Sequence, residues 1–173
     1  MSVELEINLA KPIIFQQLVA AAAVSIRDLL GVTQVPRITI EEMVKGRRGA
    51  LITRELSSGS GMLLVGLEGF EDFATVTVIN LIDVPPSYSN GFETPLRAIV
   101  SSTRSPLGYS LAACVATALA RLEGRTIIDE ATFWTSVREQ SADSFARLIA
   151  LKEMYQTIPA AAEAMYAKMK ARA

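Results

Sequence analysis

Residues 74–82 read ATVTVINLI, and this stretch decides the fold because it is dense in the β-branched residues Thr, Val and Ile. A run of this kind is typical of a strand in a sheet. Similar segments lie on both sides of it along the chain, and several of them alternate apolar and polar residues with the period of two that a half-buried strand requires. They are residues 3–9, 37–41, 50–56, 62–67, 96–100 and 125–129.

The connections between these segments predict how they pair. Residues 57–61 read SSGSG, a small polar cluster typical of a hairpin loop. Short turns between sequential strands indicate an antiparallel meander. We therefore expect an α+β fold in one domain, residues 1–173, with a mainly antiparallel sheet of about 5–6 strands and helices packed on one face.

Two long apolar helices are expected on that face. The first spans residues 12–30, between Pro12 and a stop at Gly31, and polar residues interrupt it too often for a membrane span. The second spans residues 106–123, with Ser105 as its cap and Gly124 as its stop. Residues 132–158 are expected to be mostly helical until Pro159 breaks the helix, and residues 160–173 to form a C-terminal helical extension.

The composition excludes several classes of function. The 17 basic and 18 acidic residues leave a net charge of −1, which does not favour nucleic acid or a membrane as partner. The sequence contains no histidine, which excludes a Ser-His-Asp triad and a histidine-ligated zinc site. The lone Cys114 excludes an intrachain disulfide, and its apolar neighbours indicate a buried thiol rather than a nucleophile. Together with an acidic N-terminus unlike a signal peptide, this favours a cytoplasmic protein without a metal or cofactor.

The loop at residues 83–95 and the residues after it form the first candidate binding surface. Tyrosine and arginine are common in binding hot spots, and loops often carry function. The candidates are Tyr88, Asn90, Phe92, Arg97 and Arg104. The alternative is that this loop has a disordered tip.

The segment Lys45-Gly46-Arg47-Arg48-Gly49 is a candidate anion-binding loop, because three cations lie between glycines that free the backbone. A solvated turn is the alternative. The carboxylates Glu68, Glu71 and Asp72 form a second charged group, whose spacing does not match an EF-hand. A loop anchored by neighbouring phenylalanines explains it without a metal. Another acidic pair, at residues 129–130, falls at a strand end and does not identify an acid–base dyad.

Residues 105–134, a helix of small residues followed by a short strand and a tryptophan, resemble the helix–strand unit of small bacterial α+β interaction proteins, including immunity-type domains. We expect a non-enzymatic binding or interaction protein, immunity-like or chaperone-like, because the sequence lacks histidine, a nucleotide-binding fingerprint and a reactive-cysteine context. The alternative is a small-ligand-binding protein or an enzyme with a histidine-free pocket near residues 83–104.

The C-terminal segment is expected to pack against a second copy of the chain or against a partner protein, because methionine and tyrosine side chains recur on an alanine-rich helix. The residues concerned include Met154, Tyr155, Met165, Tyr166 and Met169. Packing of this helix on its own domain is the alternative.

Overall fold

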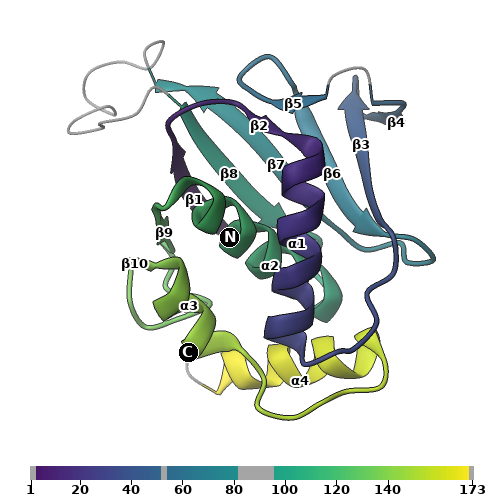
Figure 1. The fold of residues 1–173 in the computed structure, drawn as a ribbon, viewed down its shortest axis with the longest axis vertical. Coiled ribbons are helices and arrows are strands. Elements are labelled where there is room, and N and C mark those ends of the chain that lie inside the picture. Colours follow the sequence, from purple (N-terminus) through teal and green to yellow (C-terminus); the bar gives the residue numbers. More distant parts are fainter. Residues whose placement is uncertain (1–2, 52–53, 82–95, 172–173) are drawn as a thin grey trace.

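Eight strands form one antiparallel sheet in the computed structural model, which describes residues 3–51, 54–81 and 96–171 (Figure 1). In spatial order these strands are β10 (Glu139–Ser141), β9 (Thr126–Ile128), β1 (Glu4–Leu9), β8 (Leu96–Ser102), β7 (Phe73–Asn80), β6 (Met62–Leu67), β3 (Ile38–Val44) and β4 (Arg47–Gly49). A second sheet pairs β2 (Ile13–Ile14) with β5 (Glu55–Leu56). The fold is thus α+β with a large antiparallel sheet, and the expected number of about 5–6 strands is wrong.

Strand β7 lies inside this sheet, between β6 and β8, as its β-branched sequence requires. Ala74, Val76 and Val78 point to the helices and are buried, whereas the residues between them are half-buried. Strands β1 and β8 continue the same alternation. In an antiparallel pair, directly opposed residues share a face, so the register divides the sheet into an apolar helix side and an open side.

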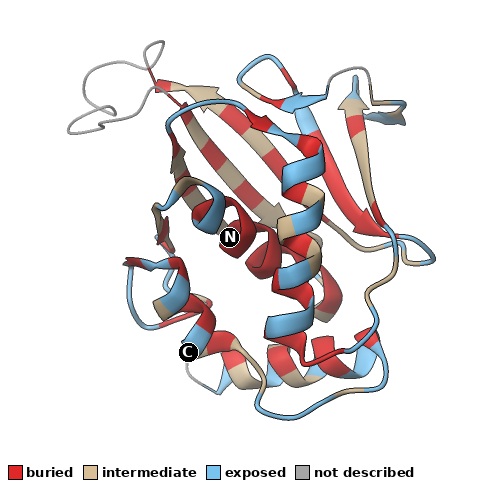
Figure 2. Cartoon of the chain, in the orientation of Figure 1, coloured by how far each residue is buried: buried red, intermediate tan, exposed pale blue. Residues whose placement is uncertain are grey.

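All four helices of the described chain lie on one face of the sheet (Figure 1). They are α1 (Phe15–Leu30), α2 (Pro106–Glu123), α3 (Ala142–Ile149) and α4 (Ile158–Lys170). Helix α2 lies directly on the sheet and is buried on nearly all sides by the sheet and the other helices (Figure 2). Its small side chains, several of them fully buried alanines, permit this close approach. At Gly108 the helix meets the segment that precedes it, where an added Cβ would lie 2.0 Å from the Thr103 Oγ1 atom. No helix among these residues combines the length and the apolar character that crossing a membrane needs.

Helix α1 is amphipathic rather than apolar all round, because buried residues recur every three or four positions on one side and exposed residues lie on the other (Figure 2). It begins at Phe15 and not at Pro12, because Ile13 and Ile14 are extended and pair with β5. The Phe15 N–H donates to the Arg54 carbonyl at 3.0 Å, which attaches the start of the helix to the same strand. The helix ends at Gly31, whose φ of 61° is the left-handed conformation that glycine adopts readily.

The expected hairpin around residues 57–61 is wrong. Among the described residues of the predicted strand 50–56, Glu55 and Leu56 alone form a strand, and they pair with β2 rather than with β6. The Ser60 hydroxyl donates to the Glu55 carbonyl and accepts from the Ser57 N–H, which closes the serine-rich turn on itself. The hairpin lies earlier in the chain: Lys45 and Gly46, with φ of 50° and 76°, join β3 to β4.

The region 132–158 is not one helix, and Pro159 does not end a helix. It contains β10 and the short helix α3, and Pro159 belongs to the first turn of α4, where its missing N–H costs nothing. Met165 and Met169 are buried within the chain, mainly against α2. The expectation that these methionines face a second copy is therefore wrong.

Candidate functional site

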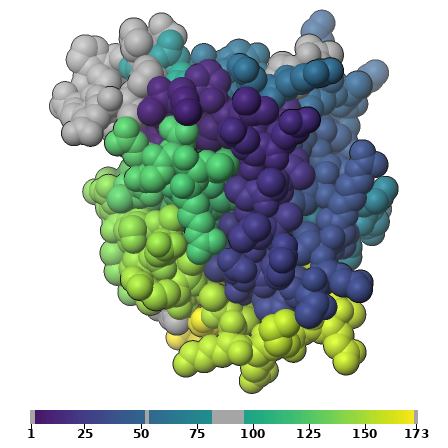
Figure 3. Space-filling view, in the orientation of Figure 1, coloured from purple at the N-terminus to yellow at the C-terminus, as the bar shows by residue number. Residues whose placement is uncertain are grey.

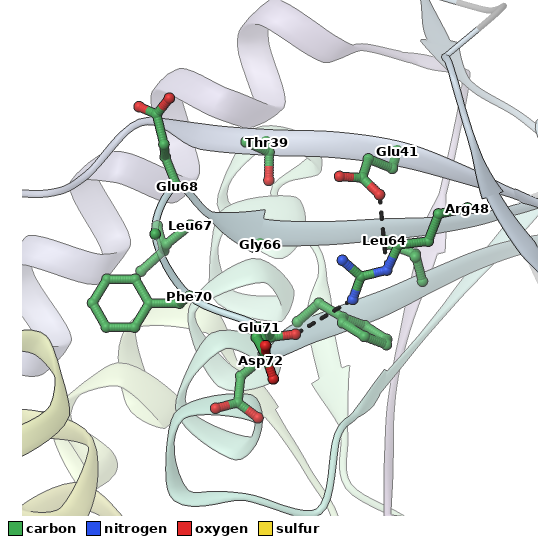
Figure 4. A pocket seen from close by; sticks show the side chains of 12 residues that line it. Thr39, Glu41, Arg48, Leu64, Gly66, Leu67, Glu68, Phe70, Glu71 and Asp72 are labelled. Atoms are coloured by element: carbon green, nitrogen blue, oxygen red, sulfur yellow. Dashed lines mark hydrogen bonds and ion pairs between the residues drawn. The ribbon is translucent and has the colours of Figure 1, made fainter.

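A pocket of about 190 Å³ opens at the corner of the sheet formed by β3, β4, β6 and β7 (Figure 4). It lies on the face of the sheet that the helices leave open, with the helices behind the strands in this view. Its polar lining comes from two segments that are separate in the sequence, the β3–β4 hairpin and the β6–β7 turn. These lining residues are Thr39, Glu41, Arg48, Glu68, Glu71 and Asp72.

Arg48 is the only cation of this lining, and three groups hold its guanidinium. The register places Arg48 opposite Met43 on β3, on the open face, two positions along from Glu41. Its Nε atom lies 3.8 Å from Glu41 Oε2, and its Nη2 donates to the Glu71 carbonyl at 3.4 Å. Its guanidinium carbon also lies 4.7 Å from the centre of the Phe73 ring, within the range of a cation–π contact.

The β6–β7 turn supplies the carboxylates of the pocket. Gly69 has a φ of 86°, which allows the chain to reverse within a few residues. Asp72 Oδ1 accepts from the hydroxyl groups of Thr103, at 3.1 Å, and Ser105, at 2.5 Å. Ser105 also caps α2, so the turn is attached to the helix layer. The side chains of Glu68 and Glu71 are exposed and form no ion pair among the described residues.

Acidic side chains outnumber basic ones on the open face of the sheet. The paired strands place two guanidinium groups on this face, those of Arg48 and Arg97. Two more arginines lie at its edges: Arg37 continues the row of Thr39 and Glu41, and Arg138 precedes β10 and pairs with Glu130. The carboxylates on its strands and at the corner pocket are those of Glu4, Glu6, Glu41, Glu139, Glu68, Glu71 and Asp72. Among the described residues the carboxylates of this face therefore outnumber its guanidinium groups by more than the net charge of −1 of the whole chain.

The first candidate surface is only partly within the described residues, since Tyr88, Asn90 and Phe92 lie outside them. Arg97 lies at the start of β8, where its Nη1 contacts Glu6 Oε2 at 2.5 Å and its Nε donates to Asn8 Oδ1 at 3.1 Å. Arg104 follows the other end of the same strand and is exposed. A strand of this length, 7 residues, separates the two arginines, so they do not form one surface patch.

The cations proposed for anion binding do not converge. Lys45 lies in the hairpin turn, and Arg47 and Arg48 are neighbours on β4, so their side chains point to opposite faces. Only Arg48 reaches the pocket, and it is already held by acceptors there. The solvated turn, the alternative considered from the sequence, describes Lys45 and Arg47, since both are exposed.

The remaining candidates for chemistry are buried. Cys114 is fully buried, and this burial raises the pKa of its thiol far above its usual range. Asp129 is also fully buried, but the backbone N–H groups of Phe133, Trp134 and Thr135 donate to its two oxygens at 2.9–3.1 Å. Its carboxylate therefore organises the loop between β9 and β10. No group of three His, Cys, Asp or Glu residues in the described part of the chain could hold a metal ion.

Sequence reasoning identified Arg48 and the acidic turn separately but missed that they meet, and it missed Thr39 and Glu41. The one available signal was the alternation in residues 37–41, which places Thr39 and Glu41 on the same face. Comparisons with protein-family models, with curated protein sequences and with solved structures gave no match.

Proposed function

We propose that this protein is a non-enzymatic binding module that receives a basic protein surface on the open face of its sheet. The observation that carries the proposal is the excess of carboxylates on that face, at and around the corner pocket. Complementary charge is how protein surfaces select partners and accelerate their encounter. The cytoplasmic location expected from the lone Cys114 is part of the proposal.

The pocket supplies an anchoring point for one arginine or lysine side chain of the partner. Arg48 supports this chemistry, because its guanidinium already lies over Phe73 and is held by a carboxylate and a carbonyl oxygen. Glu68 and Glu71 remain exposed beside it. An incoming cation would lie between these two carboxylates, with its aliphatic stem against the Phe70 ring.

Apolar side chains on the same face would supply contact area beyond the charges. Met62 on β6 is 41 % exposed, and Ile79 on β7 and Ile99 on β8 are half-buried in the cross-strand rows of the open face. Threonines at positions 75 and 77 separate these apolar groups. A mixed surface of this kind suits an interface that forms and dissociates more than an obligate one.

The alternative of a ligand-binding or enzymatic pocket near residues 83–104 has no comparable support. Residues 83–95 lie outside the described residues, and Arg97 is engaged by Glu6 and Asn8.

The test uses a defined basic probe, a peptide of alternating arginine and glycine, titrated into the isotope-labelled protein and followed by amide chemical shifts. We expect shifts at the β6–β7 turn and on β3, and binding that weakens as salt screens the charges. Replacing the two exposed carboxylates by Glu68→Gln and Glu71→Gln should weaken binding about two- to thirtyfold, since exposed ion pairs contribute about 0.2–1 kcal/mol each.

Two controls decide the result. Glu163→Gln removes an exposed carboxylate on α4, in the helix layer, and should leave the affinity unchanged. A peptide of alternating glutamate and glycine should not bind. Equal weakening by Glu163→Gln, or chemical shifts centred on the helices, would show that the open face is not the binding surface.

A further inference from the structure

A groove of about 480 Å³ lies along the outer side of α1, where the end of α2 and the segment before α1 meet it. This is the side of the molecule opposite the open sheet face, and Figure 3 shows α1 as the purple column there beside the green end of α2. We call this region the α1 surface. Its apolar and neutral members are Pro12, Ile13, Gln17, Ala20, Ala21, Val24 and Leu122.

The α1 surface combines projecting apolar groups with a depression. Val24 is 46 % exposed and Leu122 is 39 % exposed, although neither contributes to the sheet or to the core. Gln17, Ala20 and Val24 lie on one face of the helix, at spacings of three and four residues. The short side chain of Ala20 leaves a depression between the two longer ones. A contact between two identical surfaces needs projecting groups and a depression in the same patch, because each copy must supply the projections and the depression.

The charges around the α1 surface are balanced, in contrast to those of the open sheet face. Lys11 and Glu123 line the groove toward the start of α1. Arg27 and Asp28 lie at the other end of the helix and are exposed, with Asp28 3.6 Å from an α2 arginine. Two copies of α1 placed antiparallel would bring Lys11 of each copy toward Asp28 of the other, and Glu123 toward Arg27.

The balance of charge indicates which molecule covers the α1 surface. Two copies that met through their open sheet faces would bring like charges together, which opposes association. The α1 surface carries charges of both signs at opposite ends, so it is self-complementary in charge. We infer that a second copy of this chain covers it, in a symmetric dimer with α1 antiparallel to its counterpart and the two-fold axis near Ala20.

This arrangement has a consequence for binding that follows only if the proposed function holds. Because the α1 surface and the open face lie on opposite sides of the molecule (Figure 1), a dimer would present two acidic sheet faces pointing away from each other. Such a dimer would be bivalent, and a partner with repeated basic surfaces would bind with avidity. The dimer itself does not depend on the proposed function, and its test uses no ligand.

The first experiment is sedimentation equilibrium of the full chain from about 10 µM to about 500 µM, since a small interface is expected to be weak. We expect the average mass to rise from one chain toward two. Val24→Asp places a charge in the contact and should keep the protein monomeric over the whole range. Met154→Asp is the matched control, because Met154 is 69 % exposed and lies outside the α1 surface; it should dimerise like the wild type.

A cross-linking experiment keeps the inference falsifiable even if a charged variant folds poorly. Ala20→Cys introduces the only accessible thiol of the described chain, because Cys114 is fully buried. Close to a two-fold axis, two such thiols would come within the distance that a disulfide spans. Mild oxidation should therefore yield a covalent dimer from Ala20→Cys but not from Met154→Cys. A monomeric wild type at all concentrations, equal loss of association by Met154→Asp, or equal cross-linking of both cysteine variants would overturn the inference.

Discussion

Asp129 allows a sharp test of how much a single side chain contributes to stability, because its buried carboxylate accepts hydrogen bonds from three backbone N–H groups. Its Oδ1 accepts from Phe133 at 3.1 Å, and its Oδ2 accepts from Trp134 at 2.9 Å and Thr135 at 3.1 Å. Asp129→Ala leaves these donors without their acceptor. Each buried donor left unpaired costs about 1–3 kcal/mol, and water can reach the half-buried Phe133, so we expect a loss of about 3–4 kcal/mol.

Asp129→Asn separates the hydrogen bonds from the charge. The amide oxygen can still accept from Trp134 and Thr135, but the amide N–H₂ would face the Phe133 N–H. We therefore expect a smaller loss, about 1–2 kcal/mol. Chemical unfolding followed by the fluorescence of Trp134 measures both variants, because it is the only tryptophan and is fully buried. A loss below about 1 kcal/mol for Asp129→Ala would refute the assignment of the loop to this carboxylate.

Comparison of the wild type with Asp129→Asn also predicts how the free energy of unfolding changes with pH. Burial raises the pKa of Asp129 above its ordinary value, although the backbone N–H groups that donate to it act in the opposite direction. In the pH range between the unfolded and the folded pKa, the folded protein binds more protons than the unfolded chain, so stability falls as pH rises. The stability of the wild type relative to Asp129→Asn should therefore be greatest at acidic pH and decrease as the pH rises from about 4 through the folded pKa. A relative stability that increases over this range would contradict the burial of the carboxylate.

Two further predictions concern the contacts that bury α2. Gly108→Ala should destabilise the protein by about 2–3 kcal/mol in urea unfolding, because the added Cβ would lie 2.0 Å from Thr103 Oγ1. Gly59→Ala is the control, because its Cβ would meet only a serine oxygen at 4.0 Å. Similar losses of stability in the two variants would contradict the close contact at Gly108. Cys114 should react with a thiol reagent only as fast as the protein unfolds, because burial raises its pKa and blocks access. Rapid stoichiometric labelling of the native protein at alkaline pH would show that α2 is not buried in this way.

Several elements follow from local sequence alone. Residues 62–67 and 74–80 alternate or carry β-branched side chains, and both segments are strands in the structure. Helix α2 begins after the cap Ser105 and ends at Gly124, because capping depends on hydrogen bonds within a few residues of the helix end. The same local logic explains the end of α1 at Gly31.

Local sequence did not predict the conformation of a segment that pairs with a strand far away in the chain. Ile13 and Ile14 are extended because β5, about forty residues later, pairs with them, and the serine turn does not form a hairpin for the same reason. Pro159 was interpreted as a helix breaker, although its position after the cap Thr157 makes it a helix starter. The period of the apolar residues does not distinguish these cases.

What the sequence by itself determined is the composition and the local elements: an α+β chain without histidine, with one cysteine and with the caps of its helices. What only the tertiary structure decided is which side chains meet. Arg48 and the acidic turn were recognised as two unrelated charged segments, and the order of the strands brings them into one pocket. The register likewise gathers carboxylates from strands β1, β3 and β10 on one face, and the packing of α4 buries methionines that the sequence left available for a partner. The physical reason is that these contacts join residues far apart in the chain, whose meeting depends on how all the strands pair rather than on the residues beside them.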